Sequence, residues 1–222
     1  MADSKSLVRL ITVPALITLA VTILRLVGEL GHWPAPWFSN TAGGGGALVG
    51  ISWLPIIFGP WFALKLAGAG DGPASAGKSV GFAFLGAIVL VGCMFWAQSM
   101  FANLTALLLV PFLLMLVAAF IPGMGWRSLG KVLFAYALAA RVPVLIVMFI
   151  AMQGNGGAGW GTHYDAIAPQ LAQASFVEKF VYEGVVPQMT LWIGWTVVVG
   201  ALVGAIVAAI ARRGKPAAQP AA

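Results

Sequence analysis

The chain has 222 residues, of which 61% are hydrophobic and only 8% are charged, and its net charge is +6. An ordinary soluble domain is roughly half apolar and about one quarter charged, so this much apolar surface needs a lipid bilayer as its solvent. Composition therefore excludes a water-soluble enzyme, a disulfide scaffold and a disordered chain. The basic residues stand at the ends of apolar segments and form no patch, which argues against nucleic-acid binding.

Six apolar segments have the length of about 20 residues that an α-helix needs to cross a bilayer. They predict an all-α integral membrane protein, in which six transmembrane helices form one bundle. This single domain covers residues 1–215, and a disordered tail follows at 216–222. In chain order, the expected spans are residues 7–28, 47–67, 79–97, 103–121, 130–152 and 188–211.

Lysine and arginine indicate how these spans are oriented. Basic residues precede the first span, flank the second and fourth loops and follow the last span, whereas the first and third loops contain none. Because the positive-inside rule places basic loops in the cytoplasm, we expect both termini to be cytoplasmic. The Ala- and Gly-rich composition suggests the inner membrane of a bacterium as the location.

The longest expected loop covers residues 153–187, on the external side between spans five and six. It begins with a Gly-rich stretch, after which Ser175 and Glu178 have the spacing of a capping box. Apolar residues then follow at helical spacing: Phe176, Val177, Phe180 and Val181. We expect a short external amphipathic helix here, which lies on the outer surface or covers the end of the bundle.

Arg141 stands about midway along the fifth span. A charge at that depth costs about 2.5–3.5 kcal/mol on insertion scales, so Arg141 should face the bundle interior or a cavity. The acidic residues fall at span ends or in loops, and none is expected beside it. Two interpretations follow: backbone carbonyls and hydroxyls hold Arg141 as a structural element, or Arg141 binds an anionic ligand, either a substrate or a lipid phosphate.

Arg25 and Glu29 lie near the outer end of the first span. Their spacing of four residues places them on one helix face, where they can form an ion pair. In the ligand-binding interpretation these two residues line the external entrance to the Arg141 site. In the structural interpretation they form a salt bridge at the membrane interface.

The two histidines, His32 and His163, are both expected outside, and each has an acidic neighbour. Together with Glu29 and Asp165 they make a sensible donor set for a divalent metal, or for acid–base chemistry at the outer membrane surface. The sequence assures no cofactor, and a divalent metal at the external face is the one cofactor that these residues suggest. Asp165 also has a structural interpretation, because Thr162 and Asp165 have capping-box spacing.

Three functions are compatible with these features, and an enzyme is the less favoured class because no nucleotide or nucleophile motif is present. The first is a small permease or an anion- or lipid-binding transport-type protein that uses Arg141. The second is a non-catalytic subunit or assembly factor of a membrane complex. Its homo- or hetero-oligomeric contact would use the small-residue face of span six, from Gly200 to Gly204. The third is an external metal-dependent enzyme that acts on a lipid-linked substrate.

Overall fold

The computed structural model describes residues 4–42, 46–100 and 108–211, and within these ranges the chain forms helices and no strand. The expected tail at 216–222 and the expected start of the fourth span at 103 lie outside the described residues. The helices that build the bundle are α1 (Ser4–Leu30), α2 (Leu54–Gly68), α3 (Ala76–Met100), α4 (Leu109–Ala118), α5 (Ile121–Gly125), α6 (Arg127–Gly157) and α9 (Leu191–Ala211). A 3-10 turn (Pro169–Leu171) and the short segments α7 (Phe176–Lys179), η4 (Phe180–Val185) and α8 (Val186–Met189) precede α9.

Four helical segments are long and apolar enough to cross a membrane. They are Ser6–Leu30, Ala76–Met100, Arg127–Gly157 and Phe176–Ala211. Two shorter apolar helices, Leu54–Gly68 and Leu109–Gly125, occupy the places of the second and fourth expected spans. The second begins later than expected because residues 47–53 form turns and bends, and Pro55 stands in the first turn of α2, where its missing N–H is tolerated.

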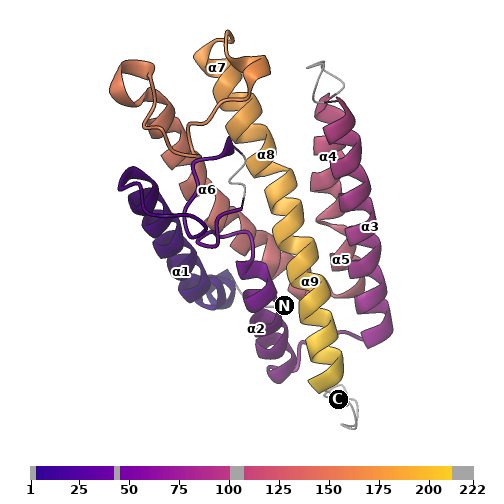
Figure 1. The fold of residues 1–222 in the computed structure, drawn as a ribbon. Coiled ribbons are helices and arrows are strands. Elements are labelled where there is room, and N and C mark those ends of the chain that lie inside the picture. The colour runs from indigo at the N-terminus through magenta and orange to yellow at the C-terminus, as the bar shows by residue number, and fades with distance from the viewer. Residues whose placement is uncertain (1–3, 43–45, 101–107, 212–222) are drawn as a thin grey trace.

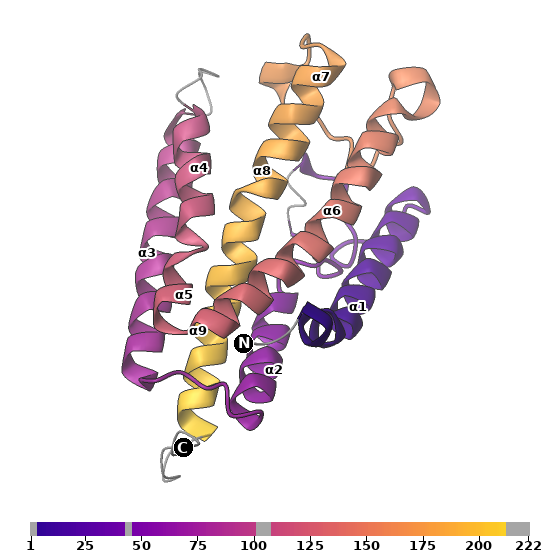
Figure 2. The same ribbon diagram turned by 180° about the vertical axis from the view of Figure 1, so that it is seen from behind.

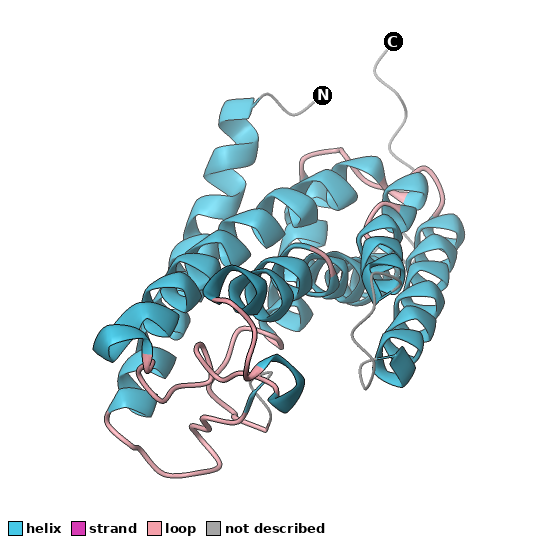
Figure 3. Ribbon diagram, turned by 90° about the horizontal axis from the view of Figure 1, so that it is seen from above, coloured by secondary structure: helices cyan, strands magenta, loops and turns pink. Residues whose placement is uncertain are grey.

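Helix α9 is the centre of the bundle and packs against α2, α3, α4 and α6. Helices α3 and α4 lie on one side of it, and α1 and α6 lie on the other (Figures 1 and 2). Seen from above, the long loops gather at one side of the helices (Figure 3). This arrangement places α1, α6 and the last helix around a common space, in which the candidate site lies.

Glycines allow α2 and α9 to approach closely. A Cβ atom at Gly59 would collide with the backbone of Gly200, and a Cβ atom at Gly204 would lie 2.6 Å from the carbonyl oxygen of Gly59. Small residues at such crossings let helix backbones come into contact. The small-residue face of the last span is therefore occupied by α2 of the same chain.

The capping box at Ser175 is confirmed. The hydroxyl of Ser175 accepts the N–H of Glu178 at 3.3 Å, and the carboxylate of Glu178 accepts the N–H of Ser175 at 2.8 Å. The helix that starts here, however, is not a separate external one, and that expectation is corrected. It continues through a π-helical turn and α8 into α9, because the segment is apolar overall despite Glu178, Lys179 and Glu183, and Pro187 stands in the first turn of α8, where its missing N–H is tolerated.

Candidate functional site

A cavity of about 340 Å³ lies between α1, α6 and the helical stretch that leads into α9. This volume is at the lower end of the range of about 300–1,000 Å³ that is usual for ligand pockets. Segments far apart in the sequence form its walls. The polar or aromatic lining residues are Thr22, Arg25, Ser52, Phe112, Arg141, His163, Tyr164, Tyr182, Glu183, Gln188 and Trp192.

Arg141 reaches this cavity from the middle of α6. It is on the buried face of that helix, which also carries Ala137, Val144 and Met148 at helical spacing. This position explains the direction of the side chain, because a residue on the inward-facing side of an amphipathic helix points into the bundle. The prediction that Arg141 faces the interior or a cavity is confirmed, since only 3% of it is exposed.

The guanidinium of Arg141 has few partners. One terminal nitrogen donates to the hydroxyl of Thr196 at 3.4 Å, and the group lies over the ring of Trp192 at 4.9 Å from its centre. Its Nε atom is buried and has no hydrogen-bond partner. Within the described ranges, no carboxylate forms a salt bridge with it. A buried cation that no carboxylate of the described residues pairs with therefore borders the cavity.

Glu29 is the centre of a second polar cluster at the outer end of α1. Its buried carboxylate accepts a hydrogen bond from Nε of Arg25 at 2.7 Å, which confirms the expected ion pair. It also accepts the backbone N–H of His163 at 2.8 Å and lies 2.7 Å from Nδ1 of the same residue. These donors satisfy a carboxylate that would otherwise be costly to bury. Arg25 and His163 both line the cavity, so the cluster forms part of its wall.

His163 belongs to the loop between α6 and α7. Burial lowers the pKa of its imidazole, while the hydrogen bond to Glu29 acts in the opposite direction. The neutral ring can donate from Nδ1 to Glu29 and keep Nε2 as an acceptor. The adjacent Tyr164 is buried, which raises its pKa, and its hydroxyl donates to the carbonyl of Thr22 at 3.1 Å. These two neighbouring residues fasten the loop to α1.

The four residues expected as a metal set do not gather in one place. Helix α1 ends at Leu30, so His32 is not on the helical face of Glu29; it is exposed, with a φ of 52°. Asp165 instead accepts the backbone N–H groups of Gly161 and Thr162 and so closes its own loop. In the part of the chain that the structure describes, no three His, Cys, Asp or Glu side chains are grouped to hold a metal ion. Of these four residues, Glu29 and His163 are the pair that the structure joins by hydrogen bonds.

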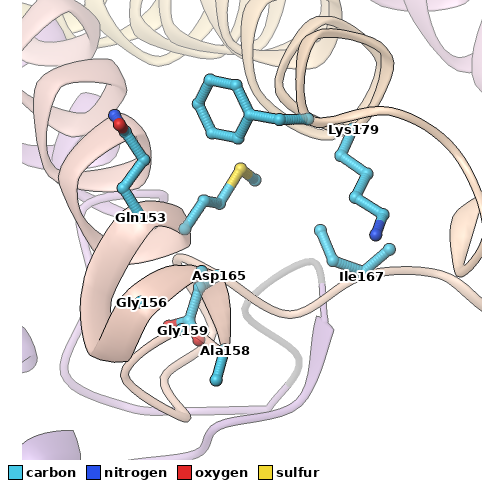
Figure 4. Close-up of a pocket in the computed structure, with 10 residues that line it drawn as sticks. Gln153, Gly156, Ala158, Gly159, Asp165, Ile167 and Lys179 are labelled. Atoms are coloured by element: carbon cyan, nitrogen blue, oxygen red, sulfur yellow. The ribbon is translucent and has the colours of Figure 1, made fainter.

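A second cavity, of about 550 Å³, lies at the end of α6 (Figure 4). Asn155 and Gly156 have φ values of 50° and 71° and end the helix there. In Figure 4 the carboxylate of Asp165 points toward Gly159 while Lys179 stands across the opening. Asp165 is already hydrogen-bonded within its loop, and neither of the buried atoms without a partner among the described residues, in Arg141 and Gln188, belongs to the lining of this cavity.

Gln188 and Trp192 are site residues that the sequence analysis did not select. Gln188 is 8% exposed, lines the cavity of Arg141, and its Oε1 atom is buried without a hydrogen-bond partner. A signal for Gln188 was present, because an uncharged amide at the start of an apolar span needs an internal partner. Trp192 carried no such signal, since tryptophan is common at both ends of membrane helices.

Comparison of the chain with models of protein families, with curated proteins and with solved structures finds no match. The function is therefore argued from the geometry of the cavity alone.

Proposed function

We propose that this protein is a small membrane permease or anion-binding transport-type protein, which holds an anionic ligand at Arg141. The observation that carries the proposal is a guanidinium only 3% exposed, without a carboxylate partner among the described residues, on the wall of a 340 Å³ cavity. Burying an arginine in a membrane helix is costly, and such residues usually serve a ligand or ion pathway. A carboxylate or phosphate group offers the two parallel acceptors that a guanidinium fits best.

The proposal includes a six-span topology in a bacterial inner membrane, with both termini in the cytoplasm. Helices α2 and α4–α5 act as the second and fourth spans. The distribution of basic residues supports this orientation. The connection from α2 to α3 and the end of α9 lie at the same end of the bundle, opposite α7 (Figures 1 and 2), as that topology requires.

Arg25, Glu29 and His163 form the external entrance in this proposal. A ligand reaches Arg141 when the loop that carries His163 moves away from α1, which breaks the hydrogen bonds to Glu29. Glycines supply hinges on both sides of Trp160, because Gly156 and Gly161 adopt positive φ values that other residues rarely adopt. Gating around a fixed central site is one form of alternating access.

The test is ligand-induced stabilisation of the purified protein in lipid nanodiscs, with acetate, propionate and inorganic phosphate as probes. A saturable rise in melting temperature with at least one probe is expected, and it should disappear in Arg141→Gln. Arg9→Gln is the matched control, because it removes an exposed arginine of α1 and should keep the rise. Uptake of the same labelled anion into proteoliposomes then separates transport from binding. Equal behaviour of wild type and Arg141→Gln would overturn the proposal.

The other two functions stand as hypotheses with their own test. A subunit or assembly factor should leave the membrane with a second protein, which native mass spectrometry of gently extracted complexes detects. An external metal-dependent enzyme should carry a metal that is lost in His163→Ala. The permease proposal expects a chain that is stable by itself and that carries a small anion or none.

A further inference from the structure

Two buried side-chain atoms lack a hydrogen-bond partner among the described residues, and both belong to the same cavity. One is Nε of Arg141, a donor, and the other is Oε1 of Gln188, an acceptor. Buried polar groups in folded proteins nearly always have partners, so each such exception needs an explanation. Here the donor and the acceptor lie on the wall of one cavity, which points to a ligand that satisfies both.

A carboxylate also belongs to the accepting groups of the cavity. Glu183 lines the same cavity, and one of its oxygens accepts the backbone N–H of Ala168 at 2.9 Å. Arg25 does not add a second free positive charge, because Glu29 neutralises it at 2.7 Å. The lining of the cavity therefore combines one cationic group, Arg141, with two accepting groups, Gln188 and Glu183.

From these groups we infer the class of ligand: a small molecule with a carboxylate or phosphate group at Arg141 and an O–H or N–H donor at Gln188 and Glu183. This inference rests on the proposed function and narrows it. Short hydroxy acids and amino acids both have this chemistry. The side chains of Phe112, Met148 and Trp192 on the cavity wall suit a short carbon skeleton.

Selectivity follows from the buried acceptor. A site built to receive a hydrogen bond rejects an analogue that lacks the donor, because the buried acceptor then loses water without gaining a partner. Lactate or alanine should therefore bind at least about tenfold more tightly than propionate, which has the same carbon skeleton and no donor. Because all three probes carry the carboxylate that Arg141 binds, the ratio of their affinities reports on the accepting groups, Gln188 and Glu183.

The experiment measures the affinities of propionate, lactate and alanine for the full-length protein in nanodiscs by isothermal titration calorimetry. In Gln188→Leu the affinity of lactate or alanine divided by that of propionate should fall toward unity, while propionate still binds. Glu183→Gln removes the negative charge but keeps an acceptor oxygen, so a selective loss of alanine would identify the donor as an ammonium group, and an unchanged preference for lactate would identify it as a hydroxyl. Gln153→Leu, at the exposed end of α6, is the control and should keep the wild-type ratio.

The failures of the inference and of the proposed function are distinguishable. If propionate binds as tightly as lactate and alanine, or if Gln188→Leu keeps the wild-type ratio, the inference is overturned while Arg141 dependence still supports the proposed function. If no probe binds, or if binding survives Arg141→Gln, the proposed function falls and the inference falls with it. Should Gln188→Leu fail to fold, Gln188→Asn keeps an amide at a shorter reach and should lower the same ratio.

Discussion

The carboxylate of Glu29 holds both the ring and the backbone of His163, a residue 134 positions further along the chain. This contact joins the outer end of α1 to the loop after α6. Arg25 completes the cluster from the preceding turn of α1. The outer wall of the cavity is thus a polar bridge between two distant segments, and breaking it should change both stability and access to Arg141.

The first prediction concerns the loss of this carboxylate. Glu29→Gln should lower the free energy of unfolding by about 3 kcal/mol or more, because it removes the buried charge that stabilises the guanidinium of Arg25. Denaturant titration of the purified protein in mixed micelles measures the change. Glu178→Gln is the control, since Glu178 is an exposed capping residue whose loss should cost much less. Equal losses in the two variants would contradict the prediction.

The second prediction is a pH dependence that arises at His163. Burial lowers the pKa of His163 in the folded protein below its ordinary value of about 6.5. As the pH falls below about 6.5, the unfolded chain takes up a proton that the folded chain resists, so stability is lost in that range. Melting temperature recorded between pH 8 and pH 5 should show this loss.

The groups that face His163 are Glu29 and Arg25 from α1 and Asp165 from its own loop. His163→Asn keeps a side-chain donor for Glu29 but has no ring to protonate, so its melting temperature should vary less over the same range. His32→Asn removes the exposed histidine and should retain the wild-type profile. A wild-type profile in His163→Asn would show that another group is responsible.

The third prediction separates a ligand-binding arginine from a structural one. The cost of placing a charge mid-membrane is about 2.5–3.5 kcal/mol, and a desolvated cation–π contact such as that with Trp192 returns about 2 kcal/mol. Arg141→Met should therefore leave the ligand-free protein as stable as the wild type, or more stable by about 1 kcal/mol, and it should abolish ligand-induced stabilisation. A loss of several kcal/mol would instead identify Arg141 as a structural element that holds the helices together.

The fourth prediction concerns the crossing of α2 and α9. Gly59→Ala should destabilise the protein by about 1–3 kcal/mol, because the new methyl group meets the backbone of Gly200 and cannot turn aside. Gly92→Ala is the matched control within helix α3, where nothing lies within 4 Å of the added atom. That control should be neutral or stabilising by about 0.5–1 kcal/mol. Unfolding in mixed micelles compares the two variants.

Several features could be read from the sequence because they depend on residues close together in the chain. The apolar composition predicted a helical membrane protein, the i, i+4 spacing predicted the pair of Arg25 and Glu29, and the capping box at Ser175 marked a helix start. The depth of Arg141 within a span predicted its burial. Each of these rests on helix geometry or on the cost of a charge in lipid, which neighbouring residues determine.

Other features were decided only by the tertiary structure. Nothing in the local sequence indicates that His163 meets Glu29 while His32 stays exposed, or that Gln188 and Glu183 share a cavity with Arg141. The same holds for the continuation of the helix at Ser175 into α9. The sequence determined that apolar helices must pack and that a buried arginine needs a partner. Which side chains surround that arginine depends on how α1, α6 and α9 pack together, and such packing is a sum of many weak contacts between segments remote in the chain.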